Sequence, residues 1–271
     1  MNESLDSSQR DRYSRSLMVA SFEEADQRRL LDGRVLVVGA GGLGSAAVQY
    51  LAAAGVGTIS IVDDGTVKRS NLQRQPIHGV DDVGEPKVDS AARFVEALNP
   101  DVTVEAHPVR VDPATAEELL TGSDVVVDGL DNFSTRFLLN DVCRLESVPF
   151  VHGAVYGLEG QTTVFRSGNS CYRCLLPEVP DPEVAPSGES MGVFPTLPGT
   201  IGCFQATETL KLLLERDGVL DDHLLRYDAT DATVVRTPLE RRPDCPVCGP
   251  DGIDSLEDVD YSDRCRIERE N

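Results

Sequence analysis

Four cysteines form the most specific pattern in the sequence, because they fall into two C-x-x-C pairs, Cys171 with Cys174 and Cys245 with Cys248. Asparagine and serine precede the first pair, and prolines and a glycine surround the second, so each pair is expected on a tight turn. Such knuckles suit a tetrahedral zinc ion bound by four thiolates, with no position open for water. The pattern predicts a structural zinc site; two disulfide or redox pairs are the alternative.

A glycine-rich stretch supplies a second candidate site. Gly39, Gly41 and Gly44 match G-x-G-x-x-G, behind the apolar run Val35–Val38 and ahead of a small-residue stretch with helical spacing. The N–H groups of such a turn can approach a phosphate at the helix N-terminus, and Asp63 follows where dinucleotide-binding folds place a ribose-binding acid. By itself, this stretch predicts binding of NAD, and the alternative is a close-packed turn that binds no nucleotide.

The segment after the second expected strand favours a triphosphate over a dinucleotide. It carries Ser70, Asn71, Gln73 and Arg74, followed by Lys87. Transfer at phosphorus develops charge on phosphate oxygens, which fixed cations stabilise; a dinucleotide already held by the glycine turn needs no such cluster. The alternative interpretation of Arg74 is a solvated surface arginine with no role in binding. This interpretation is less suitable for Lys87, because the chain contains only three lysines and otherwise prefers arginine on its surface.

Two aspartates follow a short apolar run that reads as a buried strand. Asp128 and Asp131 lie at its carboxyl end, the edge where open α/β sheets bind ligands. A carboxylate there can hold Mg²⁺, which bridges to phosphate, and Asn132 could hydrogen-bond the nucleotide. The alternative is that Asp131 and Asn132 cap the next helix, a role compatible with metal binding.

Alternating strands and helices must position these side chains. The expected strands are Arg34–Gly39, Thr58–Asp63, Val102–Val109, Asp124–Gly129, Pro149–Ala154 and Thr162–Arg166. The expected helices are Leu43–Ala54, Pro86–Leu98 (with Pro86 at its first position), Pro113–Leu120 and Thr135–Glu146. This alternation predicts an α/β fold: a doubly wound, Rossmann-like, mostly parallel sheet with a C-terminal zinc-clipped extension.

The expected organisation has four segments. Residues 1–32 form an N-terminal helical arm, and residues 33–167 form the nucleotide-binding core. Residues 168–253 belong to the same overall domain and hold a crossover loop, a long helix at Thr200–Arg216, strands at Leu224–Tyr227 and Thr233–Thr237, and the knuckles. Residues 254–271 form a charged, aperiodic tail that is expected to fray or to drape over the surface.

Composition limits the partners. A formal net charge of −21 disfavours nucleic acid, which would be repelled at long range. No apolar run reaches membrane-spanning length, and the N-terminus lacks a signal-peptide pattern, so a cytoplasmic protein with no membrane partner is expected. An acidic chain poor in lysine indicates adaptation to a high-salt cytoplasm, the alternative being simply an acidic protein.

The remaining cysteines and the histidines give weaker signals. Cys143 and Cys203 fall in helical segments and are expected to be buried small hydrophobic residues, whereas Cys265 lies in the tail. The histidines show no spacing that argues for a ligand set; they are His78, His107, His152 and His223.

Seven short motifs occur in the order and spacing of one family. They read RYSR, VVGAGGLGS, SNLQRQ, VGEPK, DGLDNFSTRFLLND, CYRCLLPE and CPVCG. In these motifs the chain resembles the MoeB/ThiF/HesA family of ubiquitin-activating-enzyme-like adenylyltransferases, including archaeal members that activate ubiquitin-like small archaeal modifier proteins. The resemblance runs from about Ser8 to Ile267.

This resemblance implies MgATP-dependent adenylation of the C-terminal glycine of a small β-grasp protein, a ubiquitin-like or MoaD/ThiS-like carrier. By matching position it implies that Gly42 contacts the nucleotide, that Asp63 binds ribose and that Asp131 orients magnesium. The phosphate contacts it implies are Ser70, Asn71, Leu72, Gln73, Arg74 and Lys87. Arg15 matches an arginine that enters the neighbouring subunit's site, which implies a homodimer. Family members serve molybdopterin, thiamine, tRNA thiolation or protein tagging.

One position departs from the family pattern. The crossover loop of these relatives carries a cysteine where this chain has Gly188, and no cysteine occurs between Cys174 and Cys203. A thioester or persulfide on that loop is therefore impossible, unless Cys203 or Cys265 replaces it. The leading hypothesis is an adenylyltransferase that stops at the adenylate. The alternatives are a non-catalytic paralogue that binds carrier or an active relative, and an NAD-linked oxidoreductase.

Overall fold

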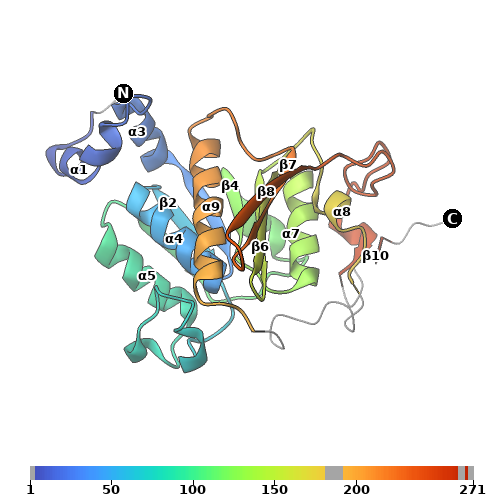
Figure 1. Cartoon of the computed structure of the whole chain (residues 1–271), viewed down its shortest axis with the longest axis horizontal. Coiled ribbons are helices and arrows are strands. Elements are labelled where there is room, and N and C mark those ends of the chain that lie inside the picture. Colours follow the sequence, from blue (N-terminus) through green and yellow to red (C-terminus); the bar gives the residue numbers. More distant parts are fainter. Residues whose placement is uncertain (1–3, 181–191, 262–265, 268–271) are drawn as a thin grey trace.

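The computed structural model describes residues 4–180, 192–261 and 266–267, and Figure 1 shows the arrangement of their elements. An eight-stranded sheet runs through the centre in the order β3-β2-β1-β4-β5-β6-β7-β8. Its strands are β1 (Arg34–Val38), β2 (Thr58–Val62), β3 (Thr103–His107), β4 (Val125–Asp128), β5 (Phe150–Tyr156), β6 (Glu159–Phe165), β7 (His223–Asp228) and β8 (Thr233–Pro238). In this spatial order, the first five strands (β3, β2, β1, β4 and β5) pair with their neighbours in parallel. The pairs β5–β6, β6–β7 and β7–β8 are antiparallel. The predicted doubly wound, mostly parallel sheet is confirmed.

Two apolar cores lie on the two faces of the sheet because strand side chains alternate between faces. Val35 and Val37 of β1 join the core formed with α4 (Gly42–Ala54), α5 (Lys87–Leu98) and α9 (Thr196–Leu213). Leu36 and Val38 join the opposite core, formed with α6 (Ala116–Leu120) and α7 (Phe133–Leu145). Figure 1 shows α4 and α9 side by side.

Several boundaries differ from the sequence-based expectation. Helix α5 begins at Lys87, because Pro86 has extended backbone (ψ 135°) and is the N-cap rather than the first helical residue. Helix α9 begins at Thr196, a turn earlier than expected. Pro198 is tolerated in its first turn, because the N–H that proline lacks would have no intrahelical acceptor there. Strands β5 and β6 form a hairpin whose turn contains Gly157 at φ +56°.

Three short helices form the expected N-terminal arm: α1 (Ser7–Arg12), α2 (Ser14–Leu17) and α3 (Glu24–Asp32). Helix α3 ends just before β1 begins, so the arm lies at the amino ends of the parallel strands. Tyr13 holds the arm in this place. Its ring packs on Gly55, the residue that follows α4, and its hydroxyl accepts a 3.0 Å hydrogen bond from Asn99, the residue that follows α5.

The C-terminal part packs against α7. Beyond the knuckle helix α8 (Tyr172–Leu175) and the sheet, η4 (Leu256–Asp258) leads into β9 (Val259–Asp260), which pairs with β10 (Arg266–Ile267). Leu256 is buried, and the Tyr261 hydroxyl donates a 2.9 Å hydrogen bond to Asp141 of α7. The first part of the tail therefore drapes over the core. Within the described residues, helices with the length and apolar character needed to cross a bilayer are not found.

Candidate functional site

The glycine turn joins β1 to α4, and close packing explains two of its glycines. Gly39 has φ +98°, and a Cβ there would lie 2.6 Å from the Gly129 carbonyl oxygen. A Cβ on Gly44 would lie 1.8 Å from the Gly39 carbonyl oxygen, so α4 could not pack on the turn. A Cβ on Gly41 would meet nothing closer than 3.6 Å. The free fold therefore does not require glycine at position 41, whereas a phosphate approaching the main chain would.

Two distant segments close around the start of α4. A Cβ on Gly42 would lie 2.8 Å from the Pro198 side chain in the first turn of α9 and 3.4 Å from the Arg74 carbonyl oxygen. The loop around η1 (Arg69–Asn71) and the beginning of α9 thus both reach the first turn of α4. The close approach of these protein atoms alone accounts for glycine at position 42.

Asp63 and Lys87 meet beside the glycine turn. The Asp63 carboxylate accepts hydrogen bonds from the N–H groups of Ala40 (2.8 Å) and Gly65 (2.7 Å). Lys87 Nζ lies 3.5 Å from Asp63 Oδ2, with both side chains largely buried. Lys87 occupies the first turn of α5, and Asp63 follows β2, so the fold brings these two predicted residues together at the carboxyl edge of the sheet.

The segment 70–74 forms a compact loop next to this pair. Asn71 Oδ1 accepts the Lys68 N–H at 3.2 Å, and Arg74 Nη1 donates to the Ser70 carbonyl oxygen at 3.1 Å. Ser70 and Gln73 are exposed, whereas Leu72 is half-buried. The Arg74 guanidinium is thus partly engaged by its own loop and keeps four further N–H donors for a ligand.

Two buried residues of this region were missed by the sequence analysis. Gln75 is 3% exposed, and its Oε1 has no hydrogen-bond partner within the part of the chain that the structure describes. Its Nε2 lies 3.8 Å from the Cβ position of Gly41, beside the open side of the turn. His78 contacts the Ala40 carbonyl oxygen (3.1 Å) and Ser90 Oγ (2.8 Å), and burial lowers its pKa. The motif spacing drew attention to Arg74, one residue before Gln75.

The two aspartates after β4 have different environments. Asp131 is exposed at the carboxyl edge of the sheet. Asn132 is the N-cap of α7, and its Oδ1 accepts the Thr135 N–H at 3.0 Å. Asp128 is fully buried and ion-paired to Arg136 at 2.6 Å. Of the two carboxylates, only Asp131 is therefore available to a ligand.

Arg15 does not join the other predicted residues. It is exposed on α2, in the arm held by Tyr13 at the C-terminal end of α5, whereas Lys87 starts α5. Helix α5 has 12 residues, a length of about 18 Å. Figure 1 likewise shows the arm at the far end of α4 and α5 from the loops that carry the site. Arg15 can thus serve such a site only on another copy of the chain.

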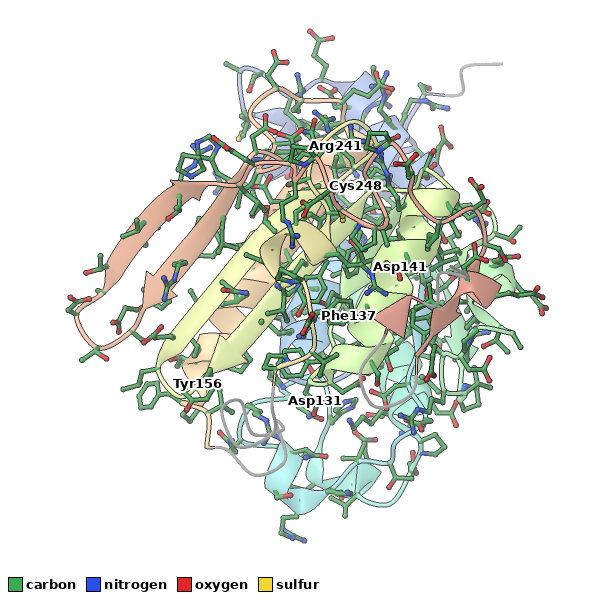
Figure 2. The ribbon with its side chains drawn as sticks, turned by 90° about the vertical axis from the view of Figure 1, so that its right-hand side faces the viewer. Asp131, Phe137, Asp141, Tyr156, Arg241 and Cys248 are labelled. Carbon is green, nitrogen blue, oxygen red and sulfur yellow. The ribbon has the colours of Figure 1, made fainter. Side chains whose placement is uncertain are left out.

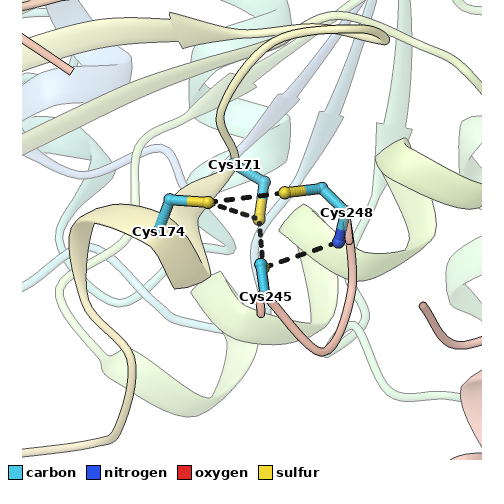
Figure 3. A group of neighbouring side chains, drawn as sticks. All are labelled: Cys171, Cys174, Cys245 and Cys248. Carbon is cyan, nitrogen blue, oxygen red and sulfur yellow. Dashed lines mark hydrogen bonds between the residues drawn. The ribbon is translucent and has the colours of Figure 1, made fainter. Parts of the chain in front are cut away.

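The four cysteines meet as predicted (Figure 3). Their Sγ atoms all lie within 4.8 Å of one another, with separations of 3.5 Å for Cys171–Cys245 and 3.4 Å for Cys174–Cys248. A tetrahedron with Zn–S bonds of about 2.3 Å has edges of about 3.8 Å, so the donor set fits zinc. Hydrogen bonds from Cys171 and Cys248, and one from the Arg242 N–H, lower the pKa of Cys174.

Polar contacts fasten the knuckle to α7. Arg173 Nη2 lies 2.6 Å from Asp141 Oδ2, and both side chains are almost completely buried. The Tyr172 N–H donates to Asn140 Oδ1 at 2.6 Å. Figure 2 shows Cys248 in the upper part of the view and Asp131 in the lower part, with Asp141 and Phe137 between them. The knuckle thus lies far from the nucleotide edge and is anchored to the helix that begins there.

Fold and site together define an α/β protein with a glycine-rich turn after β1, an edge that carries both basic and acidic side chains, and a four-cysteine knuckle. The ThiF family model matches residues 13–247, and the chain belongs to the ThiF family. The resemblance inferred from the seven motifs is confirmed.

Individual relatives cover nearly the whole chain. It is 56% identical over 267 residues to the SAMP-activating enzyme E1 of Haloferax volcanii. The match covers 98% of this chain and 99% of that protein. It is 45% identical over 263 residues to the sulfur carrier protein adenylyltransferase of Thermus thermophilus, covering 95% and 97%. The crystal structure of E. coli MccB with ATP superposes with a TM-score of 0.79 at 21% identity, over 90% of this chain and 75% of that one, a likeness of fold.

Proposed function

We propose that this chain is an adenylyltransferase that uses MgATP to activate the C-terminal glycine of a ubiquitin-like, β-grasp sulfur carrier or modifier protein. The observation that carries the proposal is the meeting of Lys87 with Asp63 beside the open glycine turn, with Asp131 exposed after β4 at the same edge of the sheet. Relatives named for adenylating a sulfur carrier and for activating SAMP support this choice of substrate.

In the proposed reaction, a carboxylate oxygen of the carrier's terminal glycine attacks the α-phosphorus of ATP. A new C–O–P linkage forms, the bond between the α-phosphorus and the bridging oxygen breaks, and pyrophosphate leaves with that electron pair. Arg74 and Lys87 stabilise the charge on the phosphate oxygens, and Asp63 holds the ribose. Asp131 would hold Mg²⁺, which neutralises charge on the phosphates. Since no covalent enzyme nucleophile takes part, binding and positioning carry the catalysis.

A homodimer completes the site in this proposal. Arg15 lies at the amino ends of the strands, remote from its own chain's Lys87, so we assign it to the partner's phosphates. Mixing an Arg15→Ala protein with an Asp131→Ala protein tests this, because mixed dimers contain one intact site. We expect exchange activity to reappear on mixing; two inactive proteins that form mixed dimers without regaining activity would contradict the assignment.

The knuckle is proposed to hold a structural zinc ion, since four thiolates leave no open position. Reduced thiolate clusters are typical of reducing compartments, which supports a cytoplasmic location. The charge of −21 and the three lysines support adaptation to high salt. Thermal unfolding at increasing KCl concentration tests that adaptation, with a midpoint that should rise well beyond the concentration at which simple screening saturates.

The decisive experiment is carrier-dependent exchange of labelled pyrophosphate into ATP. Asp131→Ala should reduce exchange by at least a hundredfold, whereas the control Glu117→Ala, at an exposed acid on α6, should retain it. Exchange that survives Asp131→Ala would remove Asp131 from its assigned role. Carrier binding without any MgATP binding would instead favour a non-catalytic paralogue, and tight NAD binding without ATP competition would favour an oxidoreductase. Gly188, which suggested the paralogue, lies outside the described residues.

A further inference from the structure

A buried polar cluster lies directly beneath the Asp131 turn. Asp128 Oδ2 accepts hydrogen bonds from Arg136 Nε at 2.6 Å and from His152 Nδ1 at 2.8 Å, and all three residues are at most 5% exposed. Burial alone would raise the pKa of Asp128, but the Arg136 guanidinium and the His152 hydrogen bond keep it below its usual value. Asp128 is therefore a fixed anion inside the protein, and its partners are held with it.

This cluster fixes the main chain that leads to Asp131. The other Asp128 oxygen accepts the Leu130 N–H at 3.0 Å, and Arg136 Nη2 donates to the Leu130 carbonyl oxygen at 2.6 Å. Both polar main-chain groups of the residue before Asp131 are thus bound to one buried ion pair. Any rotation of the Arg136 guanidinium would break the contact with the Leu130 carbonyl and release the turn.

The zinc knuckle supplies the surface against which this cluster rests. Tyr172 lies between the first two cysteines, and its ring centroid is 5.0 Å from that of His152 and 5.1 Å from that of Phe137. The Arg136 guanidinium carbon lies 5.9 Å from the centre of the Tyr172 ring. One aromatic side chain of the knuckle therefore touches two of the three members of the cluster.

We propose that Tyr172, together with the Asp128–Arg136 pair, energetically couples metal occupancy of the four-cysteine knuckle to MgATP binding at the Asp131 turn. These residues are positioning residues for the proposed adenylation, on which the inference rests. When the knuckle is loaded, Tyr172 keeps Arg136 and His152 in place, and the Leu130 main chain presents Asp131. When the knuckle opens, the ring can move, and the turn loses its support.

Thermodynamic linkage makes the coupling reciprocal, so MgATP must stabilise the knuckle by the same factor by which zinc strengthens MgATP binding. The test is the affinity for zinc, measured by equilibrium competition with a chromophoric chelator, with and without saturating MgATP. We expect MgATP to raise the affinity for zinc by a factor between about 5 and 150, the usual range for coupled sites. The readout requires no turnover and no carrier.

Two variants separate the coupling from general loosening. Tyr172→Ala keeps the four cysteines and the main-chain bond to Asn140, and should bring the ratio of zinc affinities with and without MgATP close to one. Arg136→Lys keeps the buried charge but removes the fork to the Leu130 carbonyl, and should weaken MgATP binding with zinc content unchanged. Tyr156→Ala, at a tyrosine that is 59% exposed at the end of β5, is the control and should retain the full effect.

The outcomes distinguish this inference from the proposed function. If the wild type binds MgATP and has the same affinity for zinc with and without it, the coupling is refuted while adenylation stands. If Tyr172→Ala folds, binds zinc and retains the full MgATP effect, the assignment to Tyr172 is refuted. If the wild type binds no MgATP at all, the proposed function itself fails.

Discussion

Replacing Lys87 by methionine removes one cation from the nucleotide edge and leaves most of the side-chain volume. In the free protein Lys87 Nζ lies 3.5 Å from Asp63 Oδ2, and the two side chains are 16% and 11% exposed. Asp63 keeps its hydrogen bonds from Ala40 and Gly65, so the carboxylate loses a cation but remains bound in place. The variant should therefore fold, with the negative charge of Asp63 no longer offset by Lys87.

The magnitudes separate function from stability. A charge-assisted contact in such a position contributes about 1–2 kcal/mol to folding, a small part of the about 5–15 kcal/mol that stabilises a typical domain. In the proposed reaction the same cation stabilises the triphosphate in the transition state, where loss of one such group costs about 10²–10³-fold in rate. Asp63, left without its cation, also repels the phosphates, so the upper end of that range is expected.

Pyrophosphate exchange and thermal unfolding are to be measured on the same Lys87→Met preparation under native salt. Lys211→Met is the matched control, because Lys211 pairs with Glu208 on α9 at 2.7 Å, remote from the nucleotide edge. We expect Lys87→Met to lose at least a hundredfold in exchange while its midpoint falls by only a few degrees, and Lys211→Met to retain exchange. A loss below tenfold at saturating ATP would refute the assignment of Lys87 to the phosphates.

Three further predictions follow from the packing and the titratable groups. Gly44→Ala places a Cβ 1.8 Å from the Gly39 carbonyl oxygen and should cost about 3 kcal/mol or more of unfolding free energy by denaturant titration, whereas Gly199→Ala, whose Cβ meets nothing within 4 Å, should not destabilise. Cys245→Ser should abolish zinc by elemental analysis, whereas Cys143→Ser, outside the knuckle, should retain it. Burial lowers the pKa of His152, so the unfolded chain takes up the proton first and stability must fall as the pH drops below about 6.5. His152→Asn keeps a donor for Asp128 and should remove up to about 1.4 kcal/mol per pH unit from that slope; an unchanged slope would contradict the reasoning.

The sheet and the metal knuckle were predictable from the sequence because each depends on a local pattern. Apolar runs such as Val35–Val38 mark parallel strands that are buried on both faces, and C-x-x-C spacing places two thiolates on one turn. Element ends were less predictable, because they depend on particular contacts: Asn132 caps α7 through the Thr135 N–H, and Gly157 permits the hairpin between β5 and β6. A local sequence pattern therefore predicts that a helix or strand exists, whereas tertiary contacts determine the residues at which it begins and ends.

The buried cluster under the Asp131 turn was not predictable from spacing. His152 has no regular separation from Asp128 or Arg136, and nothing in the sequence indicates that β4, α7 and β5 bring them together. The same holds for Gln75, whose buried amide lies beside Gly41 only because the loop after η1 folds back over α4. Residues that contact one another across parallel strands carry no local signature, whereas residues that bind a common ligand often lie within one motif.

Cys143 and Cys203, the described cysteines outside the knuckle, are poor candidates for taking an acyl group onward, and Cys265 lies outside the described residues. Cys143 is buried, and burial raises its pKa well above the usual value. Cys203 is half-buried on α9, and burial also raises its pKa, against the opposing effect of a hydrogen bond with Tyr50. A thiolate, not a thiol, takes up an acyl group, so neither side chain is prepared as a nucleophile. The edge formed by Asp63, Lys87 and Asp131 instead suits charge stabilisation on a phosphate, which is the work that adenylation requires.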